Sequence, residues 1–221
     1  MLFDLRSRGR RSTVRVIYAG LAVLMFGGLV LFGVGAGTGI GGLLNAFTNN
    51  ASNSNKQAIN QETKVALRAT QHNPNSAQAW ASMVQARWSQ AGTGSNFNSA
   101  TSTYTAAGKH QLRLATNAWE RYLTLTKAPS PGVATLAARA YSTIADWNGA
   151  AGAWEYVANA EPTAANAYVC LAATAYAAKQ TRKGDLAAAQ AVSLAPKLQR
   201  LQLKQELNAA KASTAVAQSC G

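Results

Sequence analysis

The stretch PGVATLAARAYSTIADWNGAAGAWEYVANAEP, residues 131–162, decides the fold together with ANAYVCLAATAYAAKQTRKGDLAAAQAVSLAP, residues 165–196. Both stretches are rich in alanine and leucine and lack runs of alternating β-branched residues, so both predict helices. Their closing prolines, Pro162 and Pro196, are 34 residues apart. A fixed period of this length indicates a structural repeat whose units stack on one another. We therefore predict an all-α fold.

Residues of defined size recur at fixed distances before each closing proline. The first stretch has Ala134, Ala137, Ala138, Tyr141, Ala150 and Trp154 at these positions, and the second has Tyr168, Leu171, Ala172, Ala175, Gly184 and Ala188. This pattern resembles that of the tetratricopeptide repeat (TPR) family. The resemblance implies that each stretch is a helix pair of an α-solenoid. The dipeptide Gly184-Asp185 predicts an altered second helix in the last pair.

A third, interrupted unit lies upstream, so the array has about three helix pairs with capping helices in residues 56–213. This unit has Trp80, Met83 and Val84 in its first half, and Ala115 and Trp119 in its second. The excess length between the halves predicts an inserted surface loop at 92–108. Residues 56–72 predict one capping helix. Residues 197–212 predict another, with Leu198, Leu201, Leu207 and Ala210 on its apolar face, before an extended tail at 214–221.

The N-terminal part of the chain has the composition of a membrane anchor. The chain is 48% hydrophobic and only 13% charged, and no charged residue lies between Arg15 and Lys56. Residues 16–34 are apolar over about the length that a transmembrane helix needs. Five arginines in the basic tail 1–15, against one aspartate, predict that the N-terminus stays in the cytoplasm. We expect a single-pass protein of a bacterial cytoplasmic membrane with its C-terminal domain outside the cytoplasm.

The small residues after the apolar segment leave an alternative open. Val34-Gly35-Ala36 has the small residues of a signal-peptide cleavage site, although the apolar segment before it is longer than such peptides usually have. The glycine- and asparagine-rich residues 35–55 predict a flexible linker between the membrane and the repeats. A cleaved chain would be a secreted binding module.

The family resemblance implies a partner-binding groove formed by fixed positions of each first helix. By register these positions are Gln78, Gln85, Trp88, Arg139, Ser142, Asn166, Ala173 and Tyr176. They lack the lysine and asparagine set with which similar chaperone-binding proteins hold a terminal carboxylate. We therefore expect a mixed polar and aromatic groove that binds an extended or helical protein segment. Trp88 is either ligand-facing or packed within the domain.

Two further residue sets are candidates for a structural or binding role. Lys197, Arg200, Lys204 and Lys211 recur at helical spacing and predict a basic face, which is either simply solvated or a docking strip for lipid head groups or an acidic protein. Cys170 and Cys220 are the only cysteines, and an exported domain favours a disulfide between them. The alternative is a buried Cys170 and a free thiol at Cys220.

The sequence shows no combination of residues for catalysis, and we expect a chain that is not an enzyme. His72 and His110 have no carboxylate or cysteine at ligand spacing, so we expect no metal and no cofactor. No glycine-rich phosphate loop precedes a helix with lysine. An extracytoplasmic domain, although basic, is not expected to bind nucleic acid.

These observations predict an interaction scaffold or adaptor whose partners are proteins bound through the groove and lipid around the anchor. Its order of tail, anchor and external repeats resembles membrane-anchored TPR adaptors that accompany the secretion translocon, which implies a role in secretion or envelope assembly. The alternatives are a structural subunit of a larger membrane complex and the secreted binding module.

Overall fold

The computed structural model describes residues 51–221, and these residues are mostly helical, as the sequence predicts. The helices are α2 (Ala51–His72), α3 (Ala77–Ala91), α4 (Ala106–Leu125), α5 (Pro131–Thr143), α6 (Trp147–Ala160), α7 (Ala165–Ala177), α8 (Thr181–Leu194), α9 (Arg200–Ala209) and α10 (Ala215–Ser219). Two 3-10 turns, η2 (Gly94–Asn96) and η3 (Lys197–Gln199), and two short strands, β1 (Phe97–Asn98) and β2 (Thr103–Tyr104), complete them.

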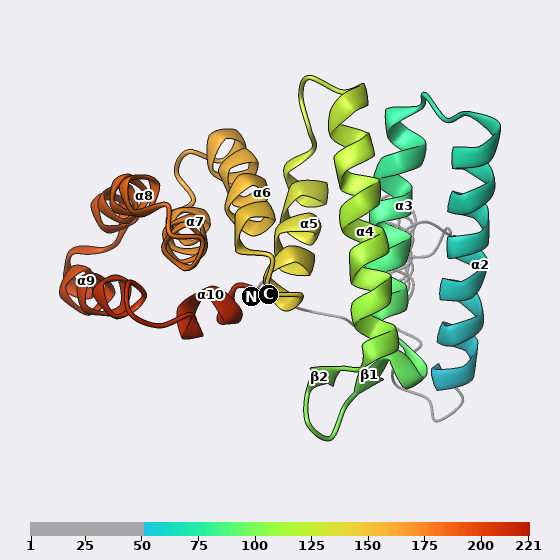
Figure 1. Ribbon diagram of the computed structural model, residues 1–221, viewed down its shortest axis with the longest axis horizontal. Coiled ribbons are helices and arrows are strands. Elements are labelled where there is room, and N and C mark those ends of the chain that lie inside the picture. The colour runs from blue at the N-terminus through green and yellow to red at the C-terminus, as the bar shows by residue number, and fades with distance from the viewer. Residues whose placement is uncertain (1–50) are drawn as a thin grey trace, which may run out of the picture. The chain divides into compact units, whose positions relative to one another are not determined.

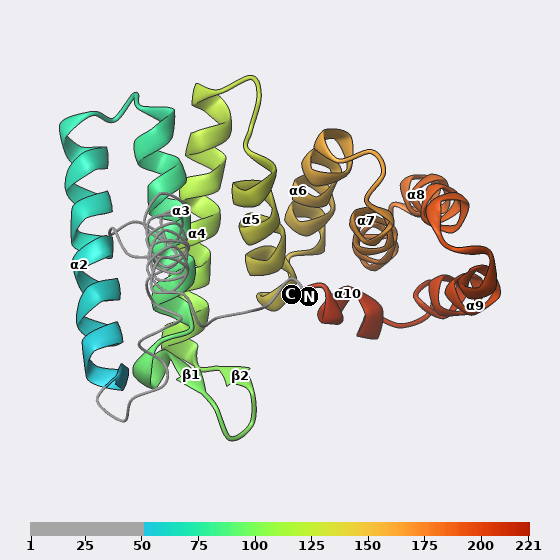
Figure 2. The ribbon, with the colours of Figure 1, turned by 180° about the vertical axis from the view of Figure 1, so that it is seen from behind.

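The helices from α2 to α9 follow one another in a row, and α10 returns toward the middle of the row (Figure 1; Figure 2 from behind). Helices α3 and α4, α5 and α6, and α7 and α8 pack as successive pairs. Each pair joins to the next through contacts of α4 with α5 and of α6 with α7. The described residues therefore form three stacked helix pairs at the positions that the sequence predicts.

The 34-residue spacing recurs in the backbone of the turns within the last two pairs. Ala145 and Lys179 both have a positive φ, 60° and 62°, and each follows the end of a first helix. The next amide bonds back over the helix end in both turns, from Asp146 to the Tyr141 carbonyl and from Gln180 to the Ala175 carbonyl. Such a bond satisfies a carbonyl that has no partner within the helix. The two turns are thus the same structure built from different residues.

Alanines let the paired helices approach closely, and large aromatic side chains fill the remaining space. Ala137, Ala138, Ala172 and Ala175 are fully buried, and Trp119 and Trp154 are almost so. Gly184 packs so closely on the ring of Tyr176 that a Cβ would overlap it, and Gly149 packs in the same way on Tyr141. The predicted alteration at Gly184-Asp185 is wrong, because α8 is continuous and the glycine instead makes room for a tyrosine.

The insertion in the first pair is an ordered hairpin rather than a loop. Strands β1 and β2 pair antiparallel, with Phe97 opposite Tyr104. Thr105 caps α4 by accepting a hydrogen bond from the Gly108 amide. Helix α4 therefore begins at Ala106, inside the range 92–108 that the sequence assigns to the loop.

Both ends of the array differ in detail from the prediction. Helix α2 begins at Ala51, so residues 51–55 are helical and do not belong to the predicted linker. At the other end Leu207 and Ala210 are buried, but Leu198 and Leu201 are 97% and 70% exposed. The predicted closing helix consists of η3 followed directly by α9. Leu201 and Leu207 both lie on α9, six residues apart, so they point to different sides of that helix, and only the side of Leu207 is buried. The predicted extended tail contains the helix α10.

Residues 1–50 lie outside the described part of the chain, and with them the predicted basic tail, the apolar segment 16–34 and the linker up to residue 50. Among residues 51–221, none of the helices combines the length and the apolar character needed to cross a membrane.

Candidate partner-binding surfaces

The residues predicted to line the groove lie on α3, α5 and α7, but only some of them are accessible. Gln78, Gln85, Arg139 and Asn166 are exposed, and Trp88 is half-buried. Ser142, Ala173 and Tyr176 are buried. The structure therefore does not present these last three residues to a partner, because other parts of the chain cover them.

Trp88 packs against the inserted hairpin. Its ring centroid lies 6.4 Å from that of Tyr104, which in turn lies 5.1 Å from that of Phe97 in an edge-on arrangement. Burial raises the pKa of the Tyr104 hydroxyl. The half-buried Trp88 thus belongs to a small aromatic cluster that fixes the hairpin to α3, and part of its surface remains open beside Gln85.

Helix α10 packs against α5 and α7 beside the predicted groove residues Arg139 and Asn166. It packs on both helices, with Ala217 fully buried and Val216 half-buried. Next to α10, Cys220 lies at a sulfur–sulfur distance of 2.08 Å from Cys170 of α7, so the structure contains the predicted disulfide. Gly221 lies beside Thr143 at the end of α5. The second half of the predicted groove is therefore occupied by the chain's own C-terminus.

A small polar pocket of about 130 Å³ lies under this cover. Its walls include Arg139 of α5, Trp154 of α6, Asn166 of α7 and Glu206 of α9, with α10 closing it. The buried indole Nε1 of Trp154 has no hydrogen-bond partner among residues 51–221. The pocket brings two predicted groove residues, Arg139 and Asn166, together, but there is no room in it for a protein segment.

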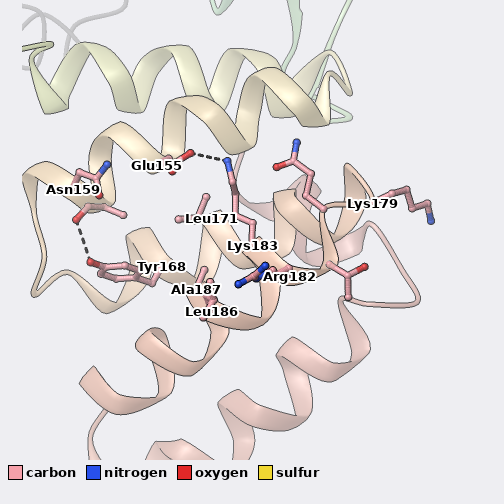
Figure 3. A pocket seen from close by; sticks show the side chains of 12 residues that line it. Glu155, Asn159, Tyr168, Leu171, Lys179, Arg182, Lys183, Leu186 and Ala187 are labelled. Atoms are coloured by element: carbon pink, nitrogen blue, oxygen red, sulfur yellow. Dashed lines mark hydrogen bonds and ion pairs between the residues drawn. The ribbon is translucent and has the colours of Figure 1, made fainter. Parts of the chain in front are cut away.

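A much larger pocket, of about 720 Å³, lies on the second helices of the last two pairs (Figure 3). Its apolar part is formed by Ala158 of α6, Tyr168 and Leu171 of α7, and Leu186 and Ala187 of α8. The Tyr168 hydroxyl donates a 3.3 Å hydrogen bond to the Ala158 carbonyl, which fixes the ring at one end of the pocket.

Charged residues surround this apolar floor. Lys183 of α8 is paired with Glu155 of α6, with its Nζ 2.6 Å from the carboxylate Oε2. Arg182 precedes Leu186 by one helical turn, so the two side chains share a face of α8. Lys179 also belongs to the lining, but its side chain points away from the pocket in Figure 3. Leu186 itself is 67% exposed.

The four residues of the predicted basic face lie on three successive segments. Only Arg200 and Lys204 lie on α9, because Lys197 lies in η3 and Lys211 lies beyond the end of α9. Arg200 donates hydrogen bonds of 2.9 Å to the Ala195 and Ser193 carbonyls, and so caps the end of α8. Two of the four predicted residues, Arg200 and Lys211, are thus bonded to other parts of the domain.

Lys211 and Tyr176 instead belong to a polar cluster around Asp185. The Asp185 carboxylate accepts a hydrogen bond of 2.9 Å from the Tyr176 hydroxyl and lies 2.8 Å from the Lys211 ammonium. These two donors, Lys211 first, lower the pKa of Asp185. Burial and the bond to Asp185 raise the pKa of Tyr176. Because the cluster joins α7, α8 and the segment after α9, the role of Tyr176 in this structure is to hold the C-terminal end together.

Residues 51–221 contain no group of three or more histidines, cysteines and carboxylates that could hold a metal ion.

No protein-family model, curated protein or solved structure matches the chain. The resemblance to tetratricopeptide repeats therefore stays a prediction from the sequence pattern. Arg182, Lys183 and Leu186 were not predicted from the sequence as binding residues. The available signal was a leucine one turn after an arginine, on a helix face that the repeat pattern does not require to be buried.

Proposed function

We propose that this chain is a scaffold that binds proteins outside the bacterial cytoplasm, through TPR-like helix pairs held at the membrane by the segment 16–34. The observation that carries the proposal is the repetition of the turn at Ala145 in the turn at Lys179, 34 residues later. Stacked identical units bury a continuous core and leave extended faces on both sides, and such arrays function mainly as binding surfaces.

The distribution of exposed side chains supports a protein as the partner. The face of α3 presents Gln78, Gln85 and part of Trp88, a polar and aromatic combination suited to an extended or helical segment. The pocket between α6 and α8 adds a concave apolar surface. An aromatic residue or a pocket of this kind typically anchors the centre of a protein interface.

The charge distribution of the N-terminal part supports the membrane attachment. Five arginines precede an uncharged apolar segment, and anchors with this asymmetry keep the basic end in the cytoplasm. A pair of cysteines in disulfide contact suits an oxidising compartment. The two alternatives, a secreted module after cleavage and a permanent subunit of a membrane complex, differ from this proposal in the mass of the native chain and in its stoichiometry.

Photocrosslinking in intact cells tests the proposal. A photoreactive amino acid replaces, one at a time, Gln85 on α3, Gln190 on α8 and Gln71 on α2, all of which are exposed. We expect a defined protein partner to be crosslinked from at least one of these positions and not from all three. The proposal is wrong if the full-length chain is present in the membrane and no position yields a crosslinked protein.

A further inference from the structure

The pocket between α6 and α8 combines two properties that a solvated surface rarely has together. It has an apolar floor of Leu171, Ala158 and Ala187, and it retains Leu186 as a largely exposed side chain at its edge. Exposed leucines are common singly, but one that borders a concave apolar pocket adds to a contiguous surface that is favourable to bury. A side chain of a partner can enter here without any change in the helices.

The charges of the pocket are unbalanced. Two basic side chains, Arg182 and Lys183, border it against a single carboxylate, that of Glu155, and a third basic residue of the lining, Lys179, points away (Figure 3). Within residues 51–221, the guanidinium of Arg182 makes no ion pair or hydrogen bond. An arginine is well suited to a partner's carboxylate, because its planar donors hold both carboxylate oxygens at once.

The one ion pair at the edge does not close the pocket to an acidic ligand. The side chains of Lys183 and Glu155 are 37% and 47% exposed. Ion pairs at such exposed positions are worth little in water, because solvent screens both charges. Lys183 can therefore exchange Glu155 for an incoming carboxylate at low cost, and Glu155 is the group that competes with that ligand.

We propose that this pocket binds an acidic protein segment, which inserts one large apolar side chain between α6 and α8 and pairs a neighbouring carboxylate with Arg182. The inference rests on the proposed function and specifies the chemistry of the partner. The spacing of Arg182 and Leu186, one turn apart on α8, places the two contacts side by side. A partner helix that carries a carboxylate and an apolar residue one turn apart matches this spacing.

An anionic membrane surface is the other ligand with the required charge. A lipid surface would use the basic side chains but has no side chain to fill a concavity of about 720 Å³. The concave apolar floor beside Arg182 therefore favours a protein segment over lipid head groups.

Fluorescence anisotropy with the full-length chain in detergent micelles tests this proposal. The probe is a dye-labelled helical peptide with blocked ends, built from leucine and glutamate one turn apart, and the comparison peptide has lysine in place of glutamate. We expect only the acidic peptide to bind. Reversal of one charge in Arg182→Glu should weaken its binding by about tenfold or more, since a hydrogen bond to a charged group is lost.

Matched variants distinguish the pocket from general charge attraction. Leu186→Ala should weaken binding severalfold, whereas Leu201→Ala, at a similarly exposed leucine of α9, should not change it. Arg113→Glu on α4 is the charge control and should change binding less than twofold at moderate salt. Glu155→Gln should strengthen binding, because it removes the carboxylate that competes with the peptide for Lys183. All four positions lie outside the buried core, so circular dichroism should show an unchanged fold.

Several results would overturn the inference. One is equal binding of the acidic and basic peptides, and another is equal loss of affinity in Arg182→Glu and Arg113→Glu. Displacement of the peptide by vesicles of anionic lipid, with the same dependence on Arg182, would assign the pocket to a membrane surface. If the peptide does not bind while Gln85 still crosslinks a protein in cells, the inference fails and the proposed scaffold function stands.

Discussion

Breaking the bond between Cys170 and Cys220 should destabilise the chain by up to about 4 kcal/mol. The bond closes a loop with a sequence separation of 50 residues. In the chain-entropy account, closing a loop of this length lowers the conformational entropy of the unfolded chain, which stabilises the folded state by about 4 kcal/mol. The measured loss should be somewhat smaller, because the native state also gains freedom when the bond is absent.

That gain of freedom should be confined to α10. A helix of five residues is far below the length at which helices are stable alone. Without the bond, α10 is held mainly by the burial of Ala217 and Val216 on α5 and α7. We therefore expect Cys220→Ser to lower the free energy of unfolding by about 3–4 kcal/mol and to release α10 in the folded protein.

Urea unfolding followed by circular dichroism measures the first effect. Cys220→Ser should unfold at a lower midpoint, and so should the reduced wild-type chain, with a somewhat larger slope because the unfolded chain exposes more surface. Gln218→Ser, at an exposed position of α10, is the control that keeps both cysteines and should leave the midpoint nearly unchanged.

Trypsin cleavage after Lys211 measures the second effect. In the wild type, a cut there leaves residues 212–221 attached through the disulfide until a reductant is added, whereas Cys220→Ser releases them at once. Alkylation of two thiols in the native, unreduced chain would refute the reasoning, and so would a Cys220→Ser midpoint equal to that of the wild type.

Three further predictions concern the repeats, the tyrosines and the topology. Gly149→Ala should lower the free energy of unfolding by about 1–3 kcal/mol, because the added Cβ would overlap the ring of Tyr141. At Gly152 on the same helix an added Cβ meets nothing within 4 Å, so Gly152→Ala should raise the free energy of unfolding by up to about 1 kcal/mol. Thermal unfolding of both variants checks the difference. Burial, and then the hydrogen bond to Glu120, raise the pKa of Tyr141 above its ordinary value of 10.0. The contribution of the Tyr141 hydroxyl to the free energy of unfolding is thus fully present below pH 10 and is lost above it, because the hydroxyl ionises more easily in the unfolded chain. The difference in the free energy of unfolding between the wild type and Tyr141→Phe, measured in urea, should therefore narrow from pH 9 to pH 11. Protease added to intact spheroplasts should digest residues 56–221, and a domain that survives until the membrane is permeabilised would show the opposite orientation.

The helix pairs could be predicted from the sequence because their signals are local and periodic. Prolines end the second helices, and small residues recur where the helices approach, so the boundaries of α5 to α8 follow from Pro162 and Pro196. Even here one signal misled: Gly184 is typical of a helix break, but its reason is the ring of Tyr176, which comes from another helix. A glycine's packing partner is not visible in a sequence.

The features that could not be predicted depend on contacts between distant segments. The exposure of Leu198 and Leu201 depends on which side of η3 and α9 packs against α7 and α8, and that side carries Leu207. Residues 97–104 read as a loop because each strand has two residues, and the hairpin is fixed by aromatic contacts of Tyr104 with Phe97 and with Trp88 of α3. The pocket with Arg182 was missed for the same reason, since α6, α7 and α8 form it together.

The covering of the groove by α10 separates the possible partner surfaces of this chain. A segment that follows the concave face from α3 would meet α10 beyond Arg139, because Cys220 and Ala217 already occupy the face of α7. On the proposed function, partners would bind the face around Gln85 and Trp88, or the pocket of Arg182 on the second helices, without disturbing the C-terminus. A partner that needs the face of α7 around Cys170 must displace α10. Its affinity should therefore rise when the disulfide is reduced, while binding at the pocket of Arg182 should not depend on the redox state.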